Sequence, residues 1–361
     1  ARAEYAADLL PELAAMGVMG MTVPTEFGGS DVDYVTYGLV FEELARGWMG
    51  LASLVGSSAS GAWLIARYGT AVQRSHYLPG LAAGTRTSGI AMTEPSTGSD
   101  LKRITLTATR DGDHYVVNGT KTMITHARHA SPMVVMVRTD PTCEPVHRGG
   151  ISLLLLERDL PGYSVGRDIG KLGHRGVELC ELVFDDARVP VSHLLGDVEG
   201  QGFYQMMSAL DRGRIYMAGA AIGIARASLE AAGRYALARE AFGSPIADYQ
   251  AIKLKLAKMA TDIAAARLLM IDAATATGRD GRASTECSMA KVFASEAAIN
   301  ASLEAMRIHG GYGYTREFPV ERYYRDAPLM AIGEGMNDIL MLTVADSVLA
   351  PSCAVPMCLG R

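Results

Sequence analysis

The spacing of the hydrophobic residues changes twice along this chain, and this change limits the possible folds more than any other feature. In the first 88 residues, apolar residues such as Leu9 and Leu13 recur at helical spacing. From about residue 90 to residue 184, apolar residues alternate with polar ones or form short runs separated by Pro and Gly, which is typical of strands. Helical spacing returns after Pro190. This order predicts a mainly α protein with a central β domain.

The changes in spacing predict three domains. We expect an N-terminal helical domain over residues 1–88, a middle β domain over 89–195 and a C-terminal helical domain over 196–361. In the middle domain, Asp111 and Gly112 separate two alternating segments and predict a hairpin. We expect the whole sheet to be antiparallel, because the segments between strand candidates leave no room for crossover helices.

The C-terminal domain is predicted to be a four-helix bundle. The Ala-rich runs 247–277 and 285–308 are strong helix formers, and their small side chains allow close helix packing. Helices of this kind often use a second face for oligomerisation. We therefore expect a bundle that also joins copies of the chain.

Charge and cysteine content exclude several classes of protein. The chain has 34 Lys and Arg against 39 Asp and Glu, a net charge of -5, which argues against attraction of nucleic acid. Its five cysteines include no C-x-x-C pair, so neither a disulfide framework nor a metal site is indicated. The sequence shows no long apolar stretch and no secretory signal pattern. We expect a soluble, cytoplasmic protein without metal or membrane partner.

Two segments of the middle region carry groups that suit a flat polar ligand. The loop Ala91–Asp100 is rich in hydroxyls, Gly and Pro, and its short donors could bind a ring edge or a phosphate. In the strand that follows, Met123 and Thr125 are two residues apart and point to the same face. One side chain could cover a ring while the other bonds to its edge. An ordinary capped turn and a half-buried strand would show the same patterns.

A single carboxylate, Glu334, lies between Gly333 and Gly335 among apolar residues. An apolar niche raises the pKa of a carboxylate and suits a general base. The same sequence is equally consistent with an exposed glutamate in a turn. Upstream, Gly310 and Gly311 follow an Ala-rich helix, where glycine is the usual C-terminal stop.

Taken together, five segments resemble the acyl-CoA dehydrogenase family in their order and spacing. The resemblance covers nearly the whole chain, from Gly17 to about Val348. It implies a FAD enzyme of three domains, helical, β-barrel-like and helical, which is usually a homotetramer built on the C-terminal bundle. The segments are 91–100, 121–125, 171–190, 239–250 and 309–334.

The resemblance also implies which residues bind FAD. In this family's pattern, Thr125 bonds near flavin N5, Met123 covers the ring, and Ser99 reaches both the flavin and the CoA arm. A second group matches the family's contacts to the FAD of a neighbouring subunit or to its adenine and pyrophosphate end. The positions that line the flavin are Met92, Thr93, Ser99, Met123 and Thr125. Those of the second group are Arg239, Phe242, Gln250, Arg307, Gly310 and Gly311.

The substrate side is implied in the same way. Asp211 and Arg214 match the family's contacts to CoA, and Ser99, Gly333 and Gly335 would also face the substrate. Glu334 takes the position of the usual catalytic base, which removes the α-proton while a hydride leaves the β-carbon for flavin N5. The product would be a trans-2-enoyl-CoA. Reduced flavin would pass its electrons to an electron-transfer flavoprotein.

Several positions depart from the family's pattern. Gly333 replaces a common aromatic residue, from which we expect tolerance for branched or bulky acyl groups in fatty acid metabolism. Some branches carry the base at the position of Gly213, which cannot serve as one. Met336, His126 and Arg307 also differ from the usual residues, and their roles stay open. Two other activities remain as alternatives: an acyl-CoA oxidase that uses oxygen, and a flavoprotein relative that associates with nucleic acid.

Overall fold

The computed structural model describes residues 5–350 and contains two compact units, which are treated separately below. The sheet unit comprises Ala1–Val32 and Gly50–Ala209, and the bundle unit comprises Asp33–Met49 and Leu210–Arg361. The chain therefore leaves the sheet unit once for a single helix and returns to it. The predicted order of helical, β and helical regions is confirmed.

The helical part of the sheet unit contains α1 (Leu10–Ala15), α3 (Met49–Tyr68) and α4 (Ala71–Ala82). Helix α3 is long and apolar enough to cross a membrane by length and composition, but 72% of its apolar window is buried inside the protein, as in a core helix. Helix α4 begins with a capping box, in which the Thr70 and Gln73 side chains each bond the other residue's backbone N–H.

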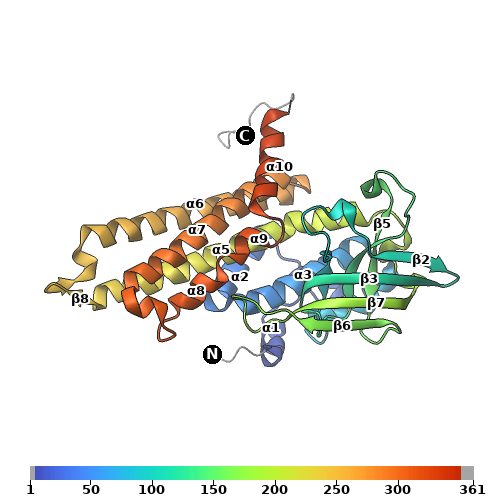
Figure 1. Ribbon diagram of the computed structural model, residues 1–361, viewed down its shortest axis with the longest axis horizontal. Helices are drawn as coiled ribbons and strands as arrows, with labels where there is room; N and C mark the ends of the chain where they lie inside the picture. Colours follow the sequence, from blue (N-terminus) through green and yellow to red (C-terminus); the bar gives the residue numbers. More distant parts are fainter. Residues whose placement is uncertain (1–4, 351–361) are drawn as a thin grey trace. The chain divides into compact units, whose positions relative to one another are not determined.

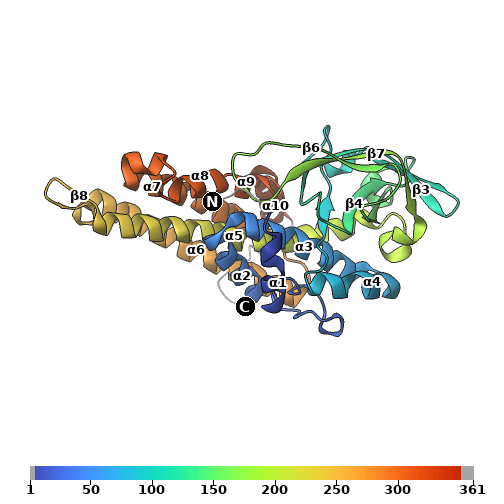
Figure 2. The same cartoon turned by 90° about the horizontal axis from the view of Figure 1, so that it is seen from below.

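A curled sheet forms the rest of this unit (Figure 2). Its strands are hydrogen-bonded in the order β1-β4-β2-β3-β7-β6. In addition, β5 pairs with β4 along the whole length of β4. The strands are β1 (Gly89–Ala91), β2 (Thr107–Asp111), β3 (His114–Thr125), β4 (Met133–Arg138), β5 (Ile151–Leu156), β6 (Tyr163–Asp168) and β7 (Leu179–Pro190).

The prediction of a purely antiparallel sheet is wrong. Strand β1 pairs with β4 in parallel, and Thr107 of β2 pairs in parallel with Arg138 of β4. A parallel pair needs a long connection, but that connection need not be a helix. Here the loop and the β2–β3 hairpin between β1 and β4 supply it. The hairpin at Asp111 and Gly112 is confirmed.

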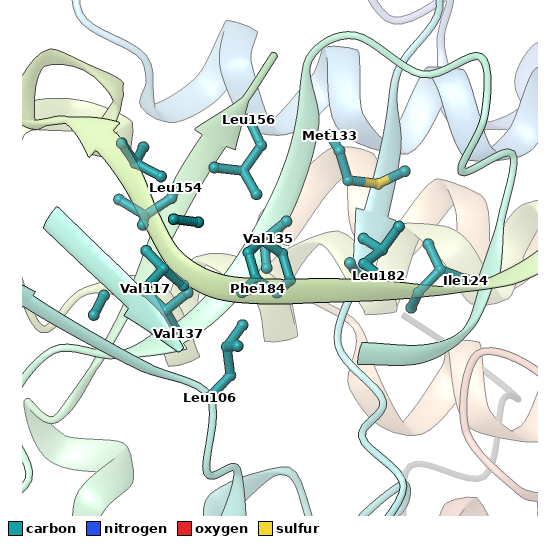
Figure 3. Close-up of a cluster of buried hydrophobic side chains, with 14 of the residues drawn as sticks. Leu106, Val117, Ile124, Met133, Val135, Val137, Leu154, Leu156, Leu182 and Phe184 are labelled. Atoms are coloured by element: carbon teal, nitrogen blue, oxygen red, sulfur yellow. The ribbon is translucent and has the colours of Figure 1, made fainter. Parts of the chain in front are cut away.

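Strands β4 and β5 read as unbroken apolar runs because both of their faces are buried. Val135 and Leu154 point into the curl of the sheet, where they meet Val117 and Phe184 (Figure 3). The alternate residues, such as Val134, pack instead with the side chains of α3 and α4. Two cores therefore lie on either side of one sheet layer, and they hold its edges and loops in place.

The bundle unit is built on three long helices that run side by side (Figure 1). A short hairpin, β8 (Glu240–Ala241) and β9 (Ser244–Pro245), joins the first two of them. The remaining helices pack against the long ones. The bounds are α2 (Tyr34–Gly47), α5 (Gly202–Ala238), α6 (Gln250–Asp280), α7 (Ser284–His309), α8 (Val320–Asp326), α9 (Leu329–Ile332) and α10 (Asn337–Leu349).

A buried carboxylate fixes α2 to the long helices. Glu42 is 1% exposed, and its carboxylate accepts hydrogen bonds from Arg226 of α5 at 2.5 Å and from Arg267 of α6. The two guanidinium groups compensate the charge that would otherwise be costly to bury. Helix α2 is thereby placed over α5, close to the part of α5 that carries site residues.

Candidate active site

The predicted flavin contacts of the sheet unit lie on two segments that a buried lysine holds together. Lys121 of β3 is fully buried, and its Nζ donates to the backbone oxygen of Met92 at 2.8 Å and to the Glu94 carboxylate at 2.9 Å. Next to it, the Thr122 backbone N–H donates to the Thr93 backbone oxygen at 2.9 Å. The loop after β1 and the end of β3 are therefore adjacent, as a shared ligand requires.

The exposed groups on these segments suit a flat ring with a polar edge. Met123 is 53% exposed, Thr93 and Thr125 are half-buried, and Ser99 is exposed. Among the described residues, the hydroxyls of Thr93, Ser99 and Thr125 have no hydrogen-bond partner. An exposed thioether and free hydroxyls on two adjacent segments are groups that fit the face and the polar edge of an isoalloxazine ring.

The local backbone differs from the regular strand that was expected at Met123. The pairing of β3 with β7 shifts between Lys121 and Ile124, and Met123 has a φ of +57°. The alternation that would put Met123 and Thr125 on one face is therefore interrupted by a bulge. Bulges re-aim single side chains, and here the result is an exposed Met123 between buried neighbours.

His126 follows this bulge and turns into the protein. Its side chain is fully buried with Nε2 3.5 Å from the Tyr5 hydroxyl, and burial lowers its pKa to about 3. Its imidazole is therefore neutral. The ring of Tyr5 also stacks on His129 at 3.7 Å between ring centroids. The departure at His126 thus places a buried, neutral imidazole among the aromatic rings of Tyr5 and His129.

In the bundle unit, Glu334 lies in a tight turn between α9 and α10. Its φ is +55° and that of Gly335 is +102°, so both residues adopt the left-handed backbone region. For a residue other than glycine this conformation is strained, and such strain is concentrated at functional positions. The side chain of Glu334 crosses to α5, where a Cβ atom added to Gly213 would lie 2.6 Å from Oε2. The carboxylate therefore rests on bare helix backbone.

Burial raises the pKa of Glu334 to about 7, while the positive charges of Arg214 and Lys291 act in the opposite direction. The buried phenols of Tyr37 and Tyr216 lie near the same carboxylate, and burial, reinforced by the charge of Glu334, raises the pKa of Tyr216. The carboxylate is thus desolvated, as the apolar-niche alternative required, but two cations and two phenols lie around it. A carboxylate with a pKa near 7 is ionised in part at neutral pH and is basic enough to take a proton.

The two predicted CoA contacts on α5 form one network. Asp211 is 3% exposed and accepts hydrogen bonds from Arg214 at 2.7 Å, from the Ser284 hydroxyl at 2.7 Å and from Arg282 at 3.2 Å. The Nε of Arg214 is buried without a hydrogen-bond partner among the described residues. Asp211 therefore orients Arg214 within the bundle unit, and direct contact of either residue with CoA stays a prediction.

The space beside Gly333 is limited by a flexible side chain. A Cβ atom at this position would lie 3.3 Å from the terminal methyl of Met217 and 3.5 Å from the backbone oxygen of Leu329. Met217 has a thioether chain that can adjust to ligands of different shape. Met336 is 43% exposed at the start of α10.

The predicted contacts to a second FAD lie at the other end of the long helices. Phe242 is 99% exposed in the β8–β9 turn, and both Arg239 and Gln250 are exposed beside it. Arg307 pairs with Glu304 at 2.5 Å. Lys255 near the start of α6 also pairs with Glu304 near the end of α7, so the start of α6 and the end of α7 lie together (Figure 1).

Gly310 and Gly311 lie at this same end, just after α7. Both are exposed, and apart from the adjacent residues no atom of the described part of the chain lies within 4 Å of a Cβ atom added to either one. Gly310 has a φ of +61°, which favours glycine. Along α5, Arg214 and Arg239 are separated by about 37 Å at 1.5 Å per residue. The two predicted groups of the bundle unit are therefore far apart.

Three supporting residues were not identified from the sequence, although two of them carry a signal. Lys121 continues the alternation of the buried residues Tyr115 and Val117 on β3, which indicates an inward lysine. Lys291 falls on the Ala-rich face of α7 by helical spacing and is fully buried. Tyr37 shows no comparable pattern, because an aromatic residue on an apolar helix face is ordinarily core.

Comparison with known proteins identifies the family. Three domain families match in order: the acyl-CoA dehydrogenase N-terminal domain over residues 1–85, the middle domain over 89–187 and the C-terminal domain over 200–349. An acyl-CoA dehydrogenase of Bacillus subtilis (strain 168) is 40% identical over 347 residues, which cover 96% of this chain and 90% of that protein. The chain belongs to the acyl-CoA dehydrogenase family.

Two further proteins are similar to this chain over most of their length. The mitochondrial isovaleryl-CoA dehydrogenase of Pongo abelii is 36% identical over 335 residues, covering 92% of this chain and 78% of that protein. The structure of butyryl-CoA dehydrogenase from Megasphaera elsdenii superposes with a TM-score of 0.92 at 35% identity, covering 96% and 91% of the two chains. As a member of this family, the chain is a FAD-dependent oxidoreductase that acts on acyl-CoA.

Proposed function

We propose that Glu334 is the base that removes the α-proton of the acyl-CoA thioester and that the product is a trans-2-enoyl-CoA. The observation that carries this proposal is the carboxylate itself: burial raises its pKa to about 7, and it lies over Gly213 at the end of a strained turn. The α-proton goes to the Glu334 carboxylate, the β-hydrogen leaves with its electron pair, and a carbon–carbon double bond forms. Bound FAD supplies the acceptor for that hydride.

The turn also offers a donor for the charge that develops on the thioester oxygen. Among the described residues, the backbone N–H of Glu334 has no hydrogen-bond acceptor. A fixed amide donor near the base would stabilise enolate character as the α-proton leaves. The two roles are separated, because the side chain accepts the proton and the backbone donates the hydrogen bond.

FAD binding is proposed to involve two copies of the chain. Met92, Thr93, Ser99, Met123 and Thr125 would hold the ring from the sheet unit, through the groups described above. The group around Phe242 lies about 37 Å along α5 from Arg214, too far to meet the same reacting atoms. We therefore infer that this exposed group contacts the FAD of another subunit, in a homotetramer.

For the substrate, we propose a branched or bulky acyl chain. The support is Gly333, which carries no side chain beside the base, so that the nearby space is bordered by the flexible Met217 and by Leu329. The isovaleryl-CoA and butyryl-CoA dehydrogenases are named for a branched and a straight acyl group, so kinship alone does not choose between them. We further propose an electron-transfer flavoprotein as the acceptor of the two electrons.

The test is anaerobic bleaching of the bound flavin by butyryl-CoA and by isovaleryl-CoA. We expect bleaching in the wild type and its loss in Glu334→Gln, with FAD still bound. Glu317→Gln is the matched control, because Glu317 is an exposed carboxylate of the same unit. Full-rate bleaching by Glu334→Gln would remove Glu334 from the mechanism. Bleaching by butyryl-CoA but not by isovaleryl-CoA would contradict the branched assignment. If the reduced flavin is reoxidised by oxygen but not by an electron-transfer flavoprotein, the enzyme is an oxidase.

A further inference from the structure

A buried lysine on α7 lies behind the turn that carries Glu334. Lys291 is fully buried, and its Nζ donates to the backbone oxygen of Gly335 at 2.7 Å and to Oδ1 of Asn337 at 3.0 Å. Both acceptors are neutral oxygens. A lysine is seldom buried without a partner of opposite charge. Its position next to the turn therefore calls for a role beyond packing.

The contacts of Lys291 fix the side of the turn that leads into α10. Asn337 is the first residue of α10, and its amide nitrogen donates to Ser295 at 3.0 Å and to Glu296 at 2.9 Å, both on α7. Gly335, whose backbone oxygen accepts the hydrogen bond from Lys291, directly follows Glu334 in the chain. A left-handed conformation at a glutamate persists only where surrounding contacts impose it. The hydrogen bonds from α7 supply such contacts.

The charge of Lys291 acts on the same carboxylate. Among residues 5–350, four titratable groups interact electrostatically with Glu334: Lys291 from α7, Arg214 from α5, and the phenols of Tyr37 from α2 and Tyr216 from α5. The cations favour the ionised carboxylate, whereas burial favours the protonated form. Asp211 pairs with Arg214 at 2.7 Å and offsets part of that positive charge.

Burial lowers the pKa of Lys291 itself to about 8. The negative charges of Glu334 and Glu296 act against this lowering, and Arg214 adds to it. Lys291 therefore carries its charge for the most part at neutral pH, where Glu334 is partly ionised. Since neither of its hydrogen-bond acceptors is charged, that positive charge is available to Glu334.

We propose that Lys291 is a positioning residue for proton abstraction, which holds the Glu334 turn through the Gly335 carbonyl and supplies positive charge beside the carboxylate. This rests on Glu334 being the base. The two contributions are separable, because the hydrogen bond fixes where the carboxylate lies and the charge decides at which pH it is ionised.

The experiment measures the rate of anaerobic flavin bleaching by acyl-CoA from pH 5.5 to pH 8.5 on the FAD-loaded enzyme. Lys291→Met removes both contributions, Lys291→Gln removes the charge but keeps a donor, and Asn337→Ala weakens the attachment but keeps the charge. We expect both Lys291 variants to move the midpoint of the pH profile upward by roughly one pH unit. Asn337→Ala should keep the wild-type midpoint while its maximum rate falls.

The outcomes distinguish this inference from the proposed function. If Glu334→Gln abolishes bleaching but neither Lys291 variant moves the midpoint, the role of Lys291 is overturned and the base stands. If Glu334→Gln bleaches at full rate, the base itself is wrong. If Lys291→Met does not fold, Lys291→Gln decides the question, because a purely structural lysine would lower the rate equally at every pH.

Discussion

Replacing Gly213 by alanine tests the position of Glu334 with a single methyl group. The added Cβ atom would lie 2.6 Å from Oε2 and 3.1 Å from Cδ of Glu334. Ordinary contact begins at 3.4 Å, so the carboxylate must withdraw by about 0.8 Å. Because Oε2 is the end of a flexible side chain, the shift is possible without moving the helix backbone.

We expect a small effect on stability and a large effect on the reaction rate. Alanine is favoured over glycine inside a helix by ~1 kcal/mol, which offsets much of the cost of the contact with Glu334. The free energy of unfolding should therefore change little. A displacement of the base by about 1 Å can cost roughly a hundredfold in rate. We expect Gly213→Ala to lower the rate of flavin bleaching by about 10- to 100-fold.

The assay is single-turnover bleaching of the flavin by saturating acyl-CoA, together with thermal unfolding of the same samples. Gly233→Ala is the matched control on the same helix, because a Cβ atom there would meet no atom within 4 Å. It should keep the wild-type rate and gain slightly in stability. A Gly213→Ala enzyme with wild-type rate would show that the carboxylate does not work from the position over Gly213.

Three further results are expected from the site. Since burial raises the pKa of Glu334 to about 7 and the base works ionised, the bleaching rate should rise with pH and at pH 6 be about a tenth of its plateau; a flat profile from pH 5.5 to 8.5 would contradict this. Lys121→Met leaves the buried Glu94 charge unpaired and should cost about 3–5 kcal/mol of stability and weaken FAD binding, measured by thermal unfolding and flavin content. Adding Glu94→Gln should recover part of the loss, and unchanged stability would show that Lys121 does not hold the two segments together. Phe242→Ala should release FAD on dilution without lowering the stability of the chain. Leu237→Ala, a control at another exposed residue of the same end, should retain FAD. Equal FAD retention by the two variants would contradict the contact of Phe242 with the FAD of a second subunit.

The parts of the fold that follow from local periodicity could be predicted, and those that depend on distant partners could not. The Ala-rich runs of α6 and α7 and the hairpin at Asp111 and Gly112 need only neighbouring residues to be recognised. The parallel pairing of β1 with β4 depends on segments more than 40 residues apart. The three-residue strand β1 is too short to show any period.

The candidate site divides in the same way. For Glu334 the sequence left an apolar niche and an exposed turn open, and the structure places Glu334 in a turn with its carboxylate directed at Gly213. Its two flanking cations come from α5 and α7, so no local pattern could supply Arg214 and Lys291 together. The bulge at Met123 also escaped prediction, because a single unpaired residue leaves the apolar alternation around it almost unchanged.

Both proposed site segments are held by the same kind of contact, in which a buried lysine donates to a backbone oxygen of a proposed site residue. Lys121 bonds the Met92 oxygen and Lys291 bonds the Gly335 oxygen, each at 2.8 Å or less. A charged donor makes a stronger hydrogen bond to a carbonyl than a neutral one. The two lysines differ in their compensation, because Glu94 neutralises Lys121 at 2.9 Å while the acceptors of Lys291 are uncharged. The first lysine can therefore fix geometry next to the proposed flavin site without adding net charge there, and the second adds charge beside the proposed base.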